Sequence, residues 1–171
     1  MNIYRNVVLA GLMSAMLVGC VTPISSSTFG NRATLSQLNA HLSAPKLKVE
    51  QPNGIYRIGD PIRFRVTSAQ TGQLWVVQID PADNVTLLYP TATNTDNRIS
   101  ANLATDLPNA SWQREWLAGQ PMGESQVAFI VTPLNKTLDD VMQIRNNRLV
   151  KTAYAKDASW SMEKLTLRVQ Q

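Results

Sequence analysis

Few side chains in this sequence have the chemistry of a catalyst or a metal ligand. The chain contains one cysteine, Cys20, and one histidine, His41. His41 lies in a stretch of Ser, Asn and Ala residues, where nothing supplies it with a partner for metal binding or base catalysis. A serine nucleophile would need a lysine base, and nothing in the sequence places a serine beside Lys151, Lys156 or Lys164. We therefore expect no catalytic residue set, no metal site, no cofactor and no enzymatic activity.

Cys20 is the one of these residues with a predicted chemical role, because it ends a segment with the layout of a secretion signal. An apolar run of 12 residues, Val7 to Val18, follows a short polar start that carries Arg5, as in a signal peptide. This run is shorter than the roughly 20 residues that a membrane-spanning helix needs. It ends in Leu17-Val18-Gly19-Cys20, which resembles a bacterial lipobox, with a small residue before the cut and a thiol after it. We predict cleavage after Gly19 and acylation of Cys20; an ordinary signal peptide with an incidental cysteine is the alternative.

The predicted lipid anchor at Cys20 determines where we expect the protein to lie and what must stabilise its fold. Loss of residues 1–19 would leave a chain from Cys20 to Gln171, enough for one domain, held in a membrane by its acyl chains. Val21 follows the cysteine, where an aspartate commonly marks inner-membrane retention in enteric bacteria. We therefore expect the outer membrane, on its periplasmic face. With no second thiol, no disulfide can form, so the apolar core must supply the stability.

The charge balance excludes one class of partner. The chain has 16 Lys+Arg and 12 Asp+Glu; without Arg5 the ratio is 15 to 12, a net charge of +3. The basic residues are scattered and form no run of five or six. Nucleic-acid binding is therefore not expected.

Composition divides the expected mature chain into two parts. Residues 20–45 are rich in Ser, Thr, Asn and Ala, which predicts a flexible tether behind the acylated cysteine. Within it, Leu35, Leu38 and Leu42 are spaced at i, i+3 and i+7, as in a short helix that docks on the domain or on a partner. Residues 46–171 are predicted to form a single β-rich domain.

The body of the chain alternates apolar and polar residues with the period of a β-strand. Strands are expected at 46–50, 62–67, 74–79, 85–89, 112–117, 126–132 and 165–169. The short turns between 62 and 89 predict a meander of three strands. Thr137, three residues before Asp140, predicts a capped amphipathic helix over about 137–146. The fold class is thus mainly β: an antiparallel β-sandwich or small barrel with one short helix near 137–146.

Tryptophans offer the one candidate binding surface. Trp112 and Trp116 have the same parity, so in a strand they point to one face with Arg114 between them. Glycan-binding surfaces and protein hot spots both use Trp with Arg. Packing of both rings in the core is the competing interpretation, and Trp75, in an apolar strand, is expected in the core.

An ordered series of residues runs through the central half of the chain. It begins with Tyr56, Gly59-Asp60, Ile62, Phe64 and Val66, continues with Leu74, Ile79-Asp80 and Leu87-Leu88-Tyr89-Pro90, and ends with Pro121-Met122-Gly123-Glu124.

In order and spacing this series resembles the bacterial domain of unknown function 4384 family over about residues 52 to 132. One departure is Asn84, which stands where the family often carries a glycine. The resemblance implies an envelope module, of a kind found as lipoproteins and appended to serine/threonine kinases or caspase-like proteins, with no established catalytic residues. Gly59, Asp60 and Asp80 are expected to act in turns.

Together these features predict a non-catalytic lipoprotein. We expect a protein-binding or scaffolding module that faces the periplasm from the outer membrane, with another envelope protein as partner. A trans-envelope assembly such as a type VI secretion system is a candidate by analogy alone. The alternative is an envelope lipoprotein that binds peptidoglycan or another glycan.

Overall fold

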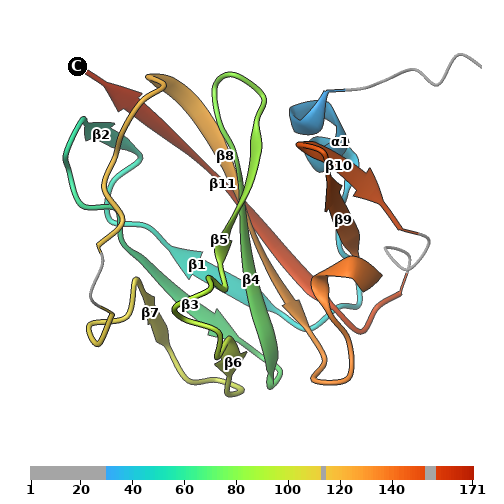
Figure 1. Ribbon diagram of the computed structural model, residues 1–171. Helices are drawn as coiled ribbons and strands as arrows, with labels where there is room; N and C mark the ends of the chain where they lie inside the picture. The colour runs from blue at the N-terminus through green and yellow to red at the C-terminus, as the bar shows by residue number, and fades with distance from the viewer. Residues whose placement is uncertain (1–29, 113–114, 153–156) are drawn as a thin grey trace, which may run out of the picture.

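Two β-sheets packed face to face form the centre of the chain (Figure 1). The computed structural model describes residues 30–112, 115–152 and 157–171. Gly19, Cys20 and Arg114 therefore lie outside the described residues, as does the expected signal peptide. Within the described residues, no helix is long and apolar enough to cross a bilayer.

The larger sheet has six strands and the smaller has three. All neighbours are antiparallel except β2 and β11, which run parallel. The sheets do not close into a barrel, so the mainly β prediction is confirmed in its sandwich form. In spatial order the larger sheet contains β2 (Ile55–Arg57), β11 (Ser161–Gln170), β8 (Gly123–Thr132), β4 (Gly72–Ile79) and β5 (Val85–Tyr89), with β6 (Arg98–Ile99) also beside β4; the smaller contains β1 (Leu47–Glu50), β3 (Phe64–Ser68) and β7 (Thr105–Leu107).

A first apolar core fills the space between the sheets. From the larger sheet, Phe129 of β8 and Val76 of β4 point into it, and Phe64 and Val66 meet them from β3. The rings of Phe64 and Phe129 pack edge to face with centroids 4.9 Å apart. This core explains the predicted alternation in β3, where Phe64 and Val66 are buried and Arg65 is exposed.

The opposite face of the larger sheet is also apolar and carries a second core. Ala128 and Ile130 of β8 alternate with the residues of the first core, and Trp160 is fully buried with them. Three segments cover this face: α1 (Asn31–Gln37), a one-turn 3-10 helix η1 (Leu138–Asp140), and a hairpin of β9 (Met142–Arg145) and β10 (Arg148–Lys151). Figure 1 shows α1 and the hairpin side by side against the sheet.

The helix expected over 137–146 is present only as the single turn of η1, and its extension beyond residue 140 is wrong. The capping box does form, since Thr137 N–H donates to Asp140 Oδ2 at 2.8 Å, but the helix stops after one turn. Asn146 and Asn147 follow, with φ of 48° and 58°. Positive φ at two successive residues makes a two-residue hairpin turn, so the chain reverses here, and Met142 and Leu149 enter the second core.

The expected three-strand meander over 62–89 is also wrong. β4 and β5 form a hairpin, but β3 pairs with β1 and β7 in the other sheet. The chain crosses between sheets at residues 69–71, so Val66 and Leu74 meet in one core from opposite sides. Gly72 permits the crossing, because a Cβ there would collide with the backbone carbonyl of Thr132 on β8.

The N-terminal helix lies in the segment predicted as a tether, and it docks on the domain. Leu35 and Leu38 are buried in the second core, as the leucine spacing predicted, whereas Leu42 is fully exposed. The docking of α1 therefore begins the folded part of the chain by residue 30, well before the expected boundary at 46.

Polar groups hold α1 at both ends. The Asp83 carboxylate accepts the backbone N–H groups of Asn31 and Arg32, each at 2.8 Å. At the other end the Lys164 ammonium donates to the carbonyls of Leu35 and Leu38, at 3.3 and 2.9 Å. Each charge has the sign that the nearby helix end prefers. Burial lowers the pKa of Lys164.

The Asn31 side chain joins α1 to both neighbouring turns. Its Nδ2 donates to the carbonyls of Asp83 and Asn147, at 2.6 and 2.9 Å, and its Oδ1 accepts the Leu149 N–H at 2.8 Å. Asn147 in turn accepts the Val85 N–H at 2.8 Å. We call these residues the asparagine junction; they fix α1, the β4–β5 turn and the β9–β10 turn together.

Leu35→Ala should lower the free energy of unfolding by about 2 to 5 kcal/mol, because it removes a fully buried side chain and leaves a cavity. Leu42→Ala makes the same chemical change at an exposed position and should stay within about 0.5 kcal/mol of the parent. Urea unfolding of the two variants measures the difference. Equal, small effects would mean that α1 does not dock.

Candidate binding surface

The two tryptophans of the candidate surface lie together at the edge of the first core. Both are half-buried and pack against that core, with ring centroids 6.0 Å apart. Trp116 also meets Phe64 at 6.2 Å, and Trp112 meets Tyr89 at 4.9 Å. The structure thus brings Trp112 and Trp116 together as an outward extension of the core, with part of each ring packed against the core and part exposed. Burial, and secondarily Asp96, raises the pKa of Tyr89.

Backbone pairing positions Trp116. The Trp116 carbonyl accepts the Ile62 N–H at 2.8 Å, and Ala118 N–H donates to the Asp60 carbonyl at 2.9 Å. Residues 113–114 lie outside the described residues. Of the predicted strand over 112–117, the structure shows these hydrogen bonds and one antiparallel bridge between Pro61 and Leu117. The Asp60 carboxylate accepts the Arg57 N–H at 2.6 Å, which confirms its expected role in a turn.

A groove opens between residues 115–121 and the inner face of β4 and β5. It consists of two adjoining cavities of about 530 and 240 Å³. Both are lined by Ile62, Gln78, Thr86, Leu117 and Leu167, so they lie next to each other. We call the pair the β5 groove.

The larger cavity of the β5 groove is mainly apolar, whereas the smaller one is more polar than apolar. Leu87 and Leu117 stand on its rim, 36% and 57% exposed, and Trp116 lines its wall. In the smaller cavity the Gln78 amide donates to Ser125 Oγ at 3.2 Å. Sequence reasoning found Trp116 but missed Leu87 and Leu117, because nothing local shows that two segments 30 residues apart face each other.

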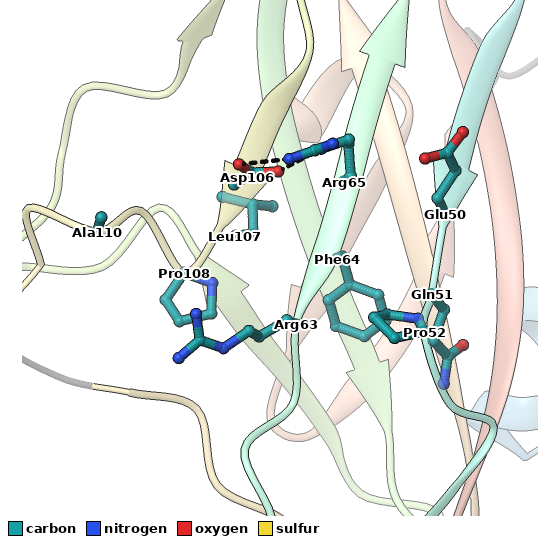
Figure 2. A pocket seen from close by; sticks show the side chains of 10 residues that line it. All are labelled: Glu50, Gln51, Pro52, Arg63, Phe64, Arg65, Asp106, Leu107, Pro108 and Ala110. Carbon is teal, nitrogen blue, oxygen red and sulfur yellow. Dashed lines mark hydrogen bonds and ion pairs between the residues drawn. The ribbon is translucent and has the colours of Figure 1, made fainter.

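A third cavity, of about 500 Å³, lies where β1, β3 and β7 end (Figure 2). Four charged side chains line it, and the structure gives each of them a partner. Arg65 binds Asp106 through two hydrogen bonds of 2.7 and 3.1 Å, and Arg63 binds Glu115 at 3.1 Å. Glu50 pairs with Lys48. Since the charges are already neutralised in pairs, this cavity presents no strong site for an ion.

The candidate catalytic groups are engaged in structural contacts. Lys164 is bound to α1 carbonyls, and Lys151 donates to Gln37 Oε1 at 3.3 Å; Lys156 lies outside the described residues. The His41 Nδ1 contacts Ser43 Oγ at 2.7 Å within one exposed turn. In the described parts of the chain, no three His, Cys, Asp or Glu residues are grouped to hold a metal ion.

Comparison with known proteins places the central part of the chain in a family. Residues 55–134 match the family model described as Domain of unknown function (DUF4384). This confirms the resemblance seen in the sequence, and this region is a DUF4384 domain. The match runs from β2 to just beyond β8, whereas α1, the β9–β10 hairpin and β11 lie outside it. No curated protein and no solved structure matched the chain.

The Asp106 carboxyl should titrate below its ordinary pKa, because the Arg65 guanidinium donates to its charged form. A group with a lowered folded-state pKa adds stability above its unfolded pKa and loses it as pH falls through the folded value. Carboxyl-carbon NMR titration should show the Asp106 pKa rising in Arg65→Gln. The Glu50 pKa, lowered mainly by Lys48, should move much less and serves as the internal control.

Proposed function

We propose that this chain is an outer-membrane lipoprotein that faces the periplasm and acts as a non-catalytic protein-binding or scaffolding module. The observation that carries the proposal is the β5 groove, an apolar channel with exposed leucines on its rim. Its occupant would be an apolar segment of another envelope protein. A trans-envelope assembly such as a type VI secretion system is the proposed setting.

The composition of the groove favours a protein segment over a small polar substrate. Leu87, Leu117 and Trp116 present apolar surface to water, and covering it is favourable in proportion to its area. Aromatic and aliphatic anchors in a concave site are typical of protein interfaces. The smaller cavity, with Gln78 and Ser125, can accept the backbone or a polar side chain of such a segment.

The absence of enzymatic activity is part of this proposal. Lys164 and Lys151 donate to groups of α1, contacts that hold the fold together rather than activate a nucleophile. Each charged residue that lines the third cavity likewise has an ion-pair partner.

A glycan-binding or peptidoglycan-binding lipoprotein is the second candidate. It is favoured by the half-buried rings of Trp112 and Trp116, because aromatic faces stack on sugars. Sedimentation with purified sacculi separates the two. A wall binder pellets and loses binding on replacement of Trp112 or Trp116, whereas a protein-binding module stays in solution.

Replacing both rim leucines, Leu87→Lys and Leu117→Lys, should weaken partner binding by roughly a hundredfold, since two interface anchors become charged. The matched control is Leu103→Lys with Leu134→Lys, which changes two exposed leucines, at 62% and 50%, that line no part of the groove. Crosslinking in intact cells, followed by identification of the protein bound to parent and variants, measures the effect. Equal loss in both double variants would contradict a role for the groove.

Cys20→Ser should release the protein from membranes, because no acyl chain can then be attached at that position. Fractionation of cells that express the parent and the variant checks this, with the mass of the mature N-terminus as the second measurement. An unacylated, cleaved parent would remove the lipid anchor from the proposed function.

A further inference from the structure

The tip of the β9–β10 hairpin concentrates positive charge on a protruding turn. Arg145 and Arg148 are paired directly across the two-residue turn of Asn146 and Asn147, and both are exposed. Within the described residues neither arginine forms an ion pair, unlike Arg32, Arg63, Arg65 and Arg168. We call residues 145–148 the basic turn. Like charges directly opposite each other on a hairpin are destabilising, so this pair of arginines adds no stability to the turn by itself.

The acidic groups near the basic turn are engaged elsewhere. Both oxygens of the Asp83 carboxylate accept backbone N–H groups of α1. Glu124 lies between Arg32 and Arg168, at 3.6 and 3.7 Å. Lys151, at the far end of β10, adds a third exposed positive charge on the same hairpin.

The asparagine junction ties this turn to the start of the folded chain. Asn31 Nδ2 donates to the Asn147 carbonyl at 2.9 Å, so the basic turn lies beside the first residue of α1. Figure 1 shows the N-terminal end of α1 and the tip of β10 at one corner, with β6 at the opposite end of the molecule. Gly30 follows Cys20 by ten positions, so the chain between them can extend over at most about 35 Å.

We propose that the basic turn is a membrane contact, in which Arg145 and Arg148 lie against the anionic phospholipid headgroups of the bilayer that holds the acylated Cys20. The proposal rests on the lipid anchor of the proposed function. The anchor limits how far the turn can move from the bilayer and so gives it a high effective concentration there. Guanidinium groups bind phosphate through paired hydrogen bonds.

This contact would also orient the sandwich. The opposite end of β4, an eight-residue strand, lies about 26 Å from the β4–β5 turn. That end carries two other exposed cations, Arg98 and Lys46. Arg98 lies there because β6 pairs with the start of β4. Lys46 lies there because its carbonyl accepts the N–H of Ala69, where the chain crosses between the sheets. With the basic turn on the bilayer, this end points away from it.

The test uses the full chain, acylated in a bacterial host and reconstituted in vesicles. A fluorophore on Val150→Cys, an exposed position on β10, reports contact with a headgroup-labelled quencher lipid. We expect stronger quenching when phosphatidylglycerol is added to phosphatidylcholine vesicles, and less at high salt. Arg145→Gln with Arg148→Gln should reduce quenching to the level of phosphatidylcholine alone.

Lys46→Gln with Arg98→Gln is the matched control, because it removes the same charge from the opposite end and should leave quenching unchanged. The arginine variant should unfold at the midpoint of the parent or slightly above it, since removal of two opposed like charges costs no native contact and relieves their repulsion. Quenching that is independent of phosphatidylglycerol, or equal losses in the two double variants, would overturn the proposal.

Mass spectrometry of the same preparation separates a failed anchor from a failed contact. If Cys20 carries no acyl chain, the lipid anchor of the proposed function is wrong. The membrane contact is then tested separately, by sedimenting the unacylated protein with the same vesicles. Binding to phosphatidylglycerol vesicles that falls on the order of tenfold in the arginine variant would still support the basic turn. No binding to those vesicles would overturn it.

Discussion

The whole structure depends on a central strand that is apolar on both faces. Along β8, Val127, Phe129 and Val131 enter one core while Ala128 and Ile130 enter the other. Burial of each valine, isoleucine or phenylalanine among them contributes about 1.5 to 3 kcal/mol only if the side chain is removed from water. The larger sheet therefore needs a covering layer on each side, and a simple two-sheet sandwich would leave one face exposed.

The second covering layer comes from segments outside the DUF4384 match. α1 and the β9–β10 hairpin cover the face that carries Ile130 and Trp160. They are joined through the asparagine junction, where Asn31 bonds to residues 52 and 116 positions away. One packing requirement thus brings the start of the folded chain and the basic turn to the same corner. This shared position links the fold to the proposed membrane contact.

Local pattern predicted the strands well and the connections poorly. Alternation predicted β3 and β11, because each has one period-two face in a core. Short apolar runs between turn residues predicted β4 and β8, which are buried on both faces. The prediction from local pattern failed at 137–146. The capping box at Thr137 is present, but Asn146 and Asn147 form the turn of a hairpin, and the local pattern did not indicate this turn. It failed again at 69–71, since a short turn serves a hairpin and a crossing between sheets equally well. Trp160 was missed because its burial depends on α1 and the hairpin covering the larger sheet.

The mainly β class, the family resemblance and many of the core-facing residues can be predicted from the sequence, because side-chain period and turn residues act over a few positions. The sequence also carries the lipobox around Cys20, which stays a prediction. Which strands share a sheet, the meeting of Leu87 and Leu117 at one groove, and the docking of α1 become visible only in the folded chain. These relations join segments that are distant along the chain, and they are set by the burial of both faces of one sheet.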